Sequence, residues 1–339
     1  MRRRDFAIGL LLAATSRPVR GQEPAKQHRI AIVIPTGLAA GIGVGDRLWM
    51  AFFQELRQLG DVEGLNLTVE RYSGEGRPER YPDLAREVVS GNPAVIVAAG
   101  NAFARAARAA TDTIPIVWIG GSLIRAGLVS SLARPGGNIT GVTSDAGIEI
   151  SGKRLQILKE AVPSASKIAY LRIEQGWGGA GGQPLPAGAE QQQLDEASRQ
   201  LKISLMDMVA REATPTELRR VFAKTEQEHP DAIIVGPMGE LIANRQLIVE
   251  LVEQSRLPAI YPWREYAEAG GLMAYAGDFV ELARRMADDV HEILNGAKPG
   301  DIPIYQPTKF EFLINRKAAD ELGLTLPATL LGRADEVIE

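Results

Sequence analysis

Short apolar runs alternate with longer amphipathic segments along most of the chain. The runs are rich in Ile and Val, which favour extended backbone, and helical periodicity marks the segments between them. The predicted strands are Ile30–Ile34, Asn66–Arg71, Ala94–Ala98, Ile116–Ile119, Ile139–Thr143, Lys167–Leu171, Ile203–Met208, Ala232–Val235, Ala259–Tyr261 and Leu272–Tyr275. This alternation predicts an α/β fold with doubly wound parallel sheets covered by helices on both faces.

Two amphipathic segments stand out as helices, 47–60 and 279–295. In the first, Trp49, Phe52 and Leu56 form one apolar stripe at helical spacing, and Gly60 supplies a stop signal. We expect this stripe to pack in a core and not to contact a ligand.

The chain also contains an internal echo, in which two segments repeat the same predicted order of helices and strands. ERYPDLAREVVSGNPAVIVAAG is followed by a helix and IPIVW, and TPTELRRVFAKTEQEHPDAIIVGP is followed by a helix and LPAIY. We interpret the echo as two similar Rossmann-like lobes, although generic βαβ units can resemble one another by chance. The predicted lobes are residues 28–142 with 277–297, and residues 143–276 with 298–339. Crossover segments at 132–150 and 274–278 would form a hinge between them.

The N-terminus has the layout of a secretory signal peptide. MRRRDFAIGLLLAATSRPVRGQEP places basic residues before a short apolar run that is too short to span a bilayer. Arg3-Arg4-Asp5-Phe6 resembles a twin-arginine export signal. We predict a signal peptide over residues 1–21 with cleavage near Gly21-Gln22, and a periplasmic protein. The alternative interpretation is a frayed basic tail.

The net charge and the cysteine and histidine content argue against several classes of function. The 339 residues carry a net charge of −4, no cysteine and three histidines that form no metal-binding pattern. These features favour neither nucleic-acid binding nor thiolate chemistry, and they make a Ser-His or His-metal site improbable. We expect no metal, no cofactor and no enzymatic activity.

The stretch IAIVIPTGLAAGIGVG, residues 30–45, tests the main enzymatic alternative. A dinucleotide finger needs G-x-G-x-x-G directly after the strand, but here Gly41, Gly43 and Gly45 are spaced G-x-G-x-G and arrive several residues late. Glu70 does lie where a ribose-binding acid would, which keeps an exported or NAD-dependent α/β enzyme open as the alternative.

Ligands of parallel α/β sheets bind outside the carboxyl ends of the strands, and those positions supply the candidate site. Three of the four tryptophans fall there. Aromatic walls suit a flat ligand, Arg264 could pair with a ligand carboxylate, and Asp278 could hold an ammonium group. For each residue, packing or solvation is the alternative. The candidates are Thr36, Gly37, Asn101, Phe103, Trp118, Gly121, Ser122, Trp177, Met238, Tyr261, Trp263, Arg264, Tyr275 and Asp278.

Several longer motifs together resemble a known family. They are the segments 77–84 (RPERYPDL), 130–141 (SSLARPGGNITG), 152–155 (GKRL), 264–273 (REYAEAGGLM), 306–310 (QPTKF) and 333–339 (RADEVIE). In this order they resemble the ABC-transporter substrate-binding family of the tryptophan/tyrosine type, over essentially all of the chain after the signal peptide.

The resemblance implies a periplasmic-binding fold of type I, which closes two hinged lobes on a small-molecule solute and delivers it to an inner-membrane ABC permease. It implies a monomer, an aromatic amino acid or aromatic acid as ligand, and contacts at Thr36, Asn101, Ser122, Tyr261 and Asp278. The chain departs from the family pattern at Asn101, at Ser122 and in the glycine-rich loop 174–188. A ligand sensor that docks on a membrane receptor remains a further alternative.

Overall fold

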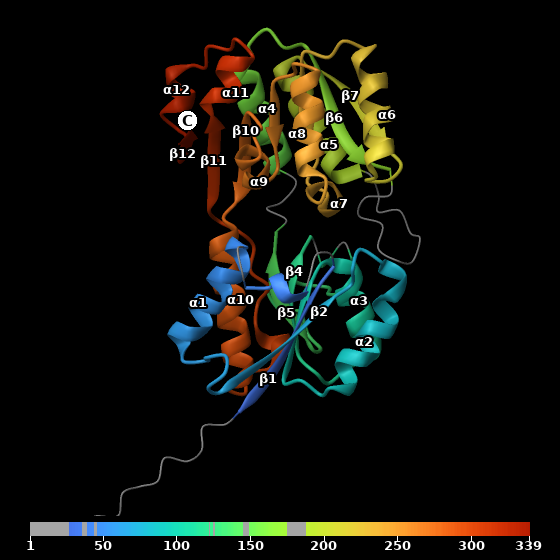
Figure 1. Ribbon diagram of the computed structural model, residues 1–339, viewed down its shortest axis with the longest axis vertical. Coiled ribbons are helices and arrows are strands. Elements are labelled where there is room, and N and C mark those ends of the chain that lie inside the picture. The colour runs from blue at the N-terminus through green and yellow to red at the C-terminus, as the bar shows by residue number, and fades with distance from the viewer. Residues whose placement is uncertain are drawn as a thin grey trace, which may run out of the picture.

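The computed structural model describes residues 27–35, 39–43, 46–121, 123–124, 126–144, 149–174 and 188–339. These residues form two lobes, one above the other in Figure 1, each built on its own β-sheet. The N-terminal lobe contains both the first part of the chain and one late helix, so its sequence is discontinuous.

The N-terminal lobe is a five-stranded parallel sheet with helices on both faces. Its strands, in the order β2-β1-β3-β4-β5, are β1 (His28–Ile34), β2 (Leu67–Ser73), β3 (Val95–Ala99), β4 (Ile116–Gly120) and β5 (Ile139–Thr143). Its helices are η1 (Ala39–Gly41), α1 (Arg47–Leu59), η2 (Pro78–Arg80), α2 (Tyr81–Ser90), α3 (Asn101–Ala110), α10 (Phe279–Leu294) and η3 (Pro299–Asp301). Helices α1 and α10 bury one face of the sheet, and α2 and α3 bury the other.

The C-terminal lobe has a seven-stranded sheet in the order β12-β11-β10-β9-β8-β6-β7. Its strands are β6 (Lys167–Ile173), β7 (Ser204–Ala210), β8 (Ala232–Val235), β9 (Ala259–Tyr261), β10 (Met273–Gly277), β11 (Phe310–Asn315) and β12 (Glu336–Ile338). Its helices are α4 (Glu149–Ala161), α5 (Gly188–Leu201), α6 (Pro215–Glu226), α7 (Gly239–Ile242), α8 (Arg245–Gln254), α9 (Arg264–Glu268), α11 (Arg316–Glu321) and α12 (Ala328–Leu331).

The first five strands of each lobe have the same order. β2-β1-β3-β4-β5 in one sheet corresponds to β7-β6-β8-β9-β10 in the other, and all of these pairings are parallel. This agrees with the echo in the sequence. The two additional strands, β11 and β12, were not expected. β11 pairs antiparallel with β10 and follows a long excursion through the other lobe, so it leaves no βαβ pattern, and β12, although parallel to β11, has only three residues.

The local sequence explains where helix α1 begins, where it ends and which face it buries. The Asp46 side chain accepts hydrogen bonds from the backbone N–H groups of Leu48 and Trp49, which caps the N-terminus. Gly60 ends the helix in the left-handed conformation at φ 96°. Phe52 and Leu56 are fully buried in the core, as the apolar stripe predicts.

The chain passes between the lobes three times, after β5, between β10 and α10, and just before β11. The second passage lies at the expected crossover. The boundary expected after residue 297 differs from the structure, because residues 299–305 pack on the N-terminal lobe. Thr140 Oγ1 donates to the carbonyl of Ile302 at 2.8 Å, and Tyr305 forms a β-bridge with Val142.

Candidate functional site

The carboxyl ends of strands β1 to β10 lie between the lobes. The chain leaves β5 at Thr143 for the C-terminal lobe and leaves β10 at Gly277 for the N-terminal lobe. Because β1 to β5 are parallel to one another, as are β6 to β10, all their carboxyl ends lie at these two facing edges. β11 runs the opposite way, so its first residue, Phe310, lies there too.

On the N-terminal edge, Asn101 and Trp118 meet above Gly120. Asn101 is the first residue of α3 and follows Gly100, whose φ of 87° turns the chain from strand to helix. A Cβ atom at Gly120 would lie 2.9 Å from both Asn101 Oδ1 and Trp118 Nε1, so the glycine makes room for both side chains. Both polar atoms are buried without a hydrogen-bond partner among the described residues, which is costly.

The other candidates of the N-terminal lobe differ from Asn101 and Trp118. Phe103 is 1% exposed and packs edge-on against Tyr81, so it is a core residue. Gly121 is half-buried directly after β4, at the inter-lobe edge. Thr36, Gly37 and Ser122, with Trp177 of the second lobe, fall outside the described residues.

On the C-terminal edge, three aromatic rings form a stack. Tyr266 lies between Tyr261, at 4.9 Å and 11° between planes, and Trp263, at 6.2 Å and 16°. Tyr261 and Tyr266 are fully buried, whereas Trp263 is partly exposed and is the N-cap residue of α9. Trp263 is therefore the member of the stack with a surface left for a further ring.

Arg264 does not present a free fork to a ligand. Its Nε is 2.8 Å from Glu268 and its Nη2 is 2.6 Å from Glu336, while Nη1 pairs with Glu311. Burial disfavours the charged guanidinium, but hydrogen bonds to these carboxylates outweigh it and raise the pKa of Arg264. The expected pairing of Arg264 with a ligand carboxylate is therefore corrected, because three carboxylates of its own chain already occupy the guanidinium.

The remaining three candidates are largely engaged within the chain. Met238 is 5% exposed, and its sulfur accepts a hydrogen bond from the Ile173 backbone N–H at 3.2 Å. Asp278 caps α10, its Oδ1 accepting from the N–H groups of Val280 and Glu281. Tyr275 is partly exposed and stacks on Phe310 at 5.6 Å.

Arg154 and Tyr266 were not among the residues predicted from the sequence to form the site. Arg154 is buried, and its Nε and Nη2 donate to the backbone carbonyls of Tyr275 and Pro262, at 2.8 and 3.3 Å. It thereby links α4, which follows the first passage between the lobes, to the ends of β9 and β10. Both residues lie in segments on which the family resemblance rests, 152–155 and 264–273, and that was the available indication.

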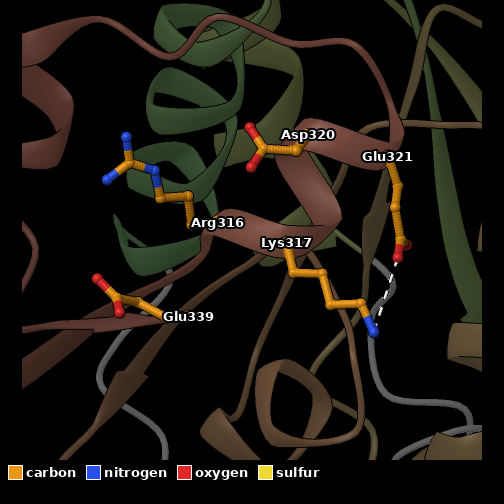
Figure 2. Close-up of a pocket in the computed structure, with 5 residues that line it drawn as sticks. All are labelled: Arg316, Lys317, Asp320, Glu321 and Glu339. Atoms are coloured by element: carbon orange, nitrogen blue, oxygen red, sulfur yellow. Dashed lines mark ion pairs between the residues drawn. The ribbon is translucent and has the colours of Figure 1, made fainter.

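A separate hollow lies at the opposite end of the C-terminal lobe. It is lined by Arg316, Lys317, Asp320, Glu321 and Glu339 (Figure 2). These residues follow β11 and β12 at the ends that point away from the other lobe. The lining is entirely charged and includes a loose Lys317–Glu321 ion pair at 3.8 Å, so this hollow does not offer the apolar walls of a typical solute site.

The described residues hold no group of three or more His, Asp or Glu side chains placed to bind a metal ion. None of the helices described is both long enough and apolar enough to cross a membrane.

Comparison with known proteins identifies the family. A family model described as ABC transporter substrate binding protein matches residues 49–338, which is most of the chain. The chain belongs to this substrate-binding protein family. The resemblance drawn from the sequence motifs is thus confirmed, and so is the type I periplasmic-binding fold.

Named relatives of this substrate-binding protein include a tyrosine-binding protein of Clostridioides difficile. It is 24% identical over 289 residues, which cover 82% of this chain and 77% of the relative. Among solved structures, a conserved domain protein of Vibrio cholerae has a TM-score of 0.79 at 24% identity, covering 92% of this chain and all of the other. An ABC domain from Streptococcus pneumonia in complex with L-Trp has a TM-score of 0.77 at 20% identity, with the same coverage.

Proposed function

We propose that this substrate-binding protein captures a small organic solute with an aromatic ring between its two lobes, and delivers it to an inner-membrane ABC permease. The observation that carries the proposal is the partly exposed Trp263, which ends a stack of three nearly parallel rings at the carboxyl edge of the C-terminal sheet. A ligand ring placed on Trp263 would extend this stack.

The facing edge of the N-terminal lobe supports the polar half of the proposal. Asn101 Oδ1 can accept and the indole N–H of Trp118 can donate a hydrogen bond, and both atoms lie buried without partners among the described residues, with the Trp118 ring itself in the core of the lobe. A ligand that carries a donor and an acceptor beside its ring would satisfy both groups. An aromatic amino acid or aromatic acid has that chemistry, and the names of a tyrosine-binding relative and an L-Trp complex agree with it.

The proposed mechanism is a shift between open and closed arrangements of the lobes. A ligand that contacts both facing edges binds the closed arrangement more tightly and increases its population. The three passages of the chain between the lobes, at 143–149, 277–279 and 305–310, are the segments about which such a motion would occur. The permease would recognise the closed arrangement.

One of the glycines that suggested a dinucleotide-binding site has a structural role in the fold. Gly43 has φ of 92°, and a Cβ there would lie 2.9 Å from the Phe53 ring. The turn before α1 therefore needs glycine for packing against its own helix, without reference to a phosphate. Gly45 falls outside the described residues.

A thermal-shift screen of the chain from Gln22 onward tests the proposal. Aromatic amino acids, aromatic acids, nucleobases, sugars and NAD would be compared, because a ligand that binds only the native state raises Tm. We expect aromatic amino acids or acids to raise Tm by several degrees, Trp263→Ala to abolish the increase, and Trp263→Phe to retain most of it. An increase with sugars alone would overturn the aromatic part of the proposal, and an increase with NAD alone would favour the enzymatic alternative.

A further inference from the structure

An ion pair connects the two lobes through α9, the short helix that also carries Tyr266 of the aromatic stack. Arg47 Nη1, on the first residue of α1 in the N-terminal lobe, is 3.6 Å from Glu268 Oε1, on the last residue of α9 in the C-terminal lobe. The helices are joined only through distant parts of the chain, so this contact depends on how the lobes are arranged.

The C-terminal side of this contact is rigid and acidic. Arg264 is 8% exposed and holds Glu268, Glu311 and Glu336, which come from α9, β11 and β12. Three carboxylates therefore pair with one guanidinium, and the negative charges of Glu268 and Glu311 also act on Glu265. The cluster keeps excess negative charge at the edge that faces the N-terminal lobe.

On the N-terminal side of the contact, the positive charge of Arg47 opposes the dipole of its own helix, α1. The N-terminus of a helix carries partial positive charge and disfavours a cation, yet α1 begins with Arg47. The acidic cluster opposite explains a cation there. Arg47 also attracts Glu311 across the same gap, whereas Asp46, the cap of α1, repels Glu265 and weakens the contact.

We propose that the structure holds the lobes in their closed arrangement, and that Arg47 and the acidic cluster of Glu268, Glu311 and Glu336 form an electrostatic clasp that favours this arrangement before any ligand binds. Both partners of the direct pair are about half exposed, at 53% and 43%, so the clasp is weak and screened by salt. A weak clasp biases the equilibrium between the two arrangements without locking either, and ligand binding can then complete closure. This inference rests on the two-lobe fold and does not depend on the proposed ligand.

The clasp can be measured on ligand-free protein by pulsed electron-spin resonance. The chain has no cysteine, so Arg86→Cys on α2 and Arg219→Cys on α6 would carry one spin label on each lobe at exposed positions. We expect Arg47→Glu to change the ratio of open to closed distances by about fivefold or more, since one exposed ion pair accounts for up to about fivefold and reversal adds repulsion. Salt at about 0.5 M should open the parent protein in the same direction.

Two further variants distinguish the clasp from a local effect. The exchange variant Arg47→Glu with Glu268→Arg should restore most of the closed population. Arg57→Glu, the same change at the other end of α1, should leave the distances unchanged. A role of Arg47 in helix stability alone predicts the opposite pattern, because Arg47→Glu would suit the helix dipole and raise Tm without moving the labels. Unchanged distances in Arg47→Glu, or equal changes in Arg57→Glu, would overturn the clasp.

Discussion

Asp289 illustrates at the residue scale how burial changes an acid. It lies on α10 at 9% exposed, and its Oδ2 has no hydrogen-bond partner among the described residues. Burial raises the pKa of Asp289 to about 8, with a further contribution from Glu292 and Asp288. The carboxyl is therefore mostly protonated in the folded protein near pH 7, whereas in the unfolded chain it is ionised.

The stability of the protein should consequently fall as pH rises from about 4 towards 8, through the titration of Asp289. The folded-state pKa is the higher one, so the stabilisation is fully present below the unfolded pKa and is lost as pH rises to the folded pKa. Asp289→Asn should raise the free energy of unfolding at pH 8.5 by on the order of 1–4 kcal/mol and change it little at pH 4. Urea unfolding at both pH values measures this, with exposed Asp320→Asn as control. An equal effect of Asp289→Asn at both pH values would contradict it.

At the scale of elements, β5 depends on a glycine that brings two strands together. Gly141 has φ of 134°, and a Cβ there would lie 2.0 Å from the Trp118 carbonyl oxygen and 2.4 Å from its backbone nitrogen. No rotation of a side chain relieves contact with backbone, so β4 and β5 would have to separate. The same two strands lead to the half-buried Gly121 and to the first passage between the lobes.

We expect Gly141→Ala to lower the free energy of unfolding by more than about 3 kcal/mol or to prevent folding. Gly152→Ala in α4 is the matched control. There the nearest atom to a new Cβ is the Cβ of Ala197 at 3.4 Å, and alanine favours helix, so stability should stay the same or rise by about 0.5–1 kcal/mol. Chemical denaturation of both variants decides the matter. Native stability in Gly141→Ala would show that the strands tolerate a wider spacing.

For the whole molecule, the proposed role requires export. Residues 1–26 lie outside the described part of the chain, so the signal peptide stays a prediction from the sequence. We expect the mature protein in the periplasmic fraction to begin at Gln22, as mass spectrometry would show. Changing both Arg3 and Arg4 to Lys should hold the precursor in the cytoplasm, whereas Arg2→Lys should not. Continued export of the double variant would exclude the twin-arginine route, and a full-length cytoplasmic protein would exclude the signal peptide itself.

The sequence by itself determined the α/β class and the parallel strands, because apolar periodicity and glycine or proline stops are local properties of the chain. It also indicated the repeated lobes and placed Asn101 and Trp263 just after strands, since a strand end is visible in the pattern, whereas Trp118 lies inside β4 and is buried in the core. The antiparallel β11 was not visible in this way, because its pairing with β10 joins segments separated by a whole helix of the other lobe.

Only the tertiary structure decided what each side chain contacts. The sequence predicted that Arg264 would pair with a ligand carboxylate. In the structure, Glu311 and Glu336, which are distant along the chain, pair with its guanidinium instead. Residues 299–305 joined the N-terminal lobe because backbone groups of β5 and the Thr140 hydroxyl form hydrogen bonds with them. Arg47 and Glu268 lie on different lobes. Hydrophobic periodicity reports which face of an element is buried, whereas partners in ion pairs and hydrogen bonds depend on how distant elements meet, and no local pattern encodes that meeting.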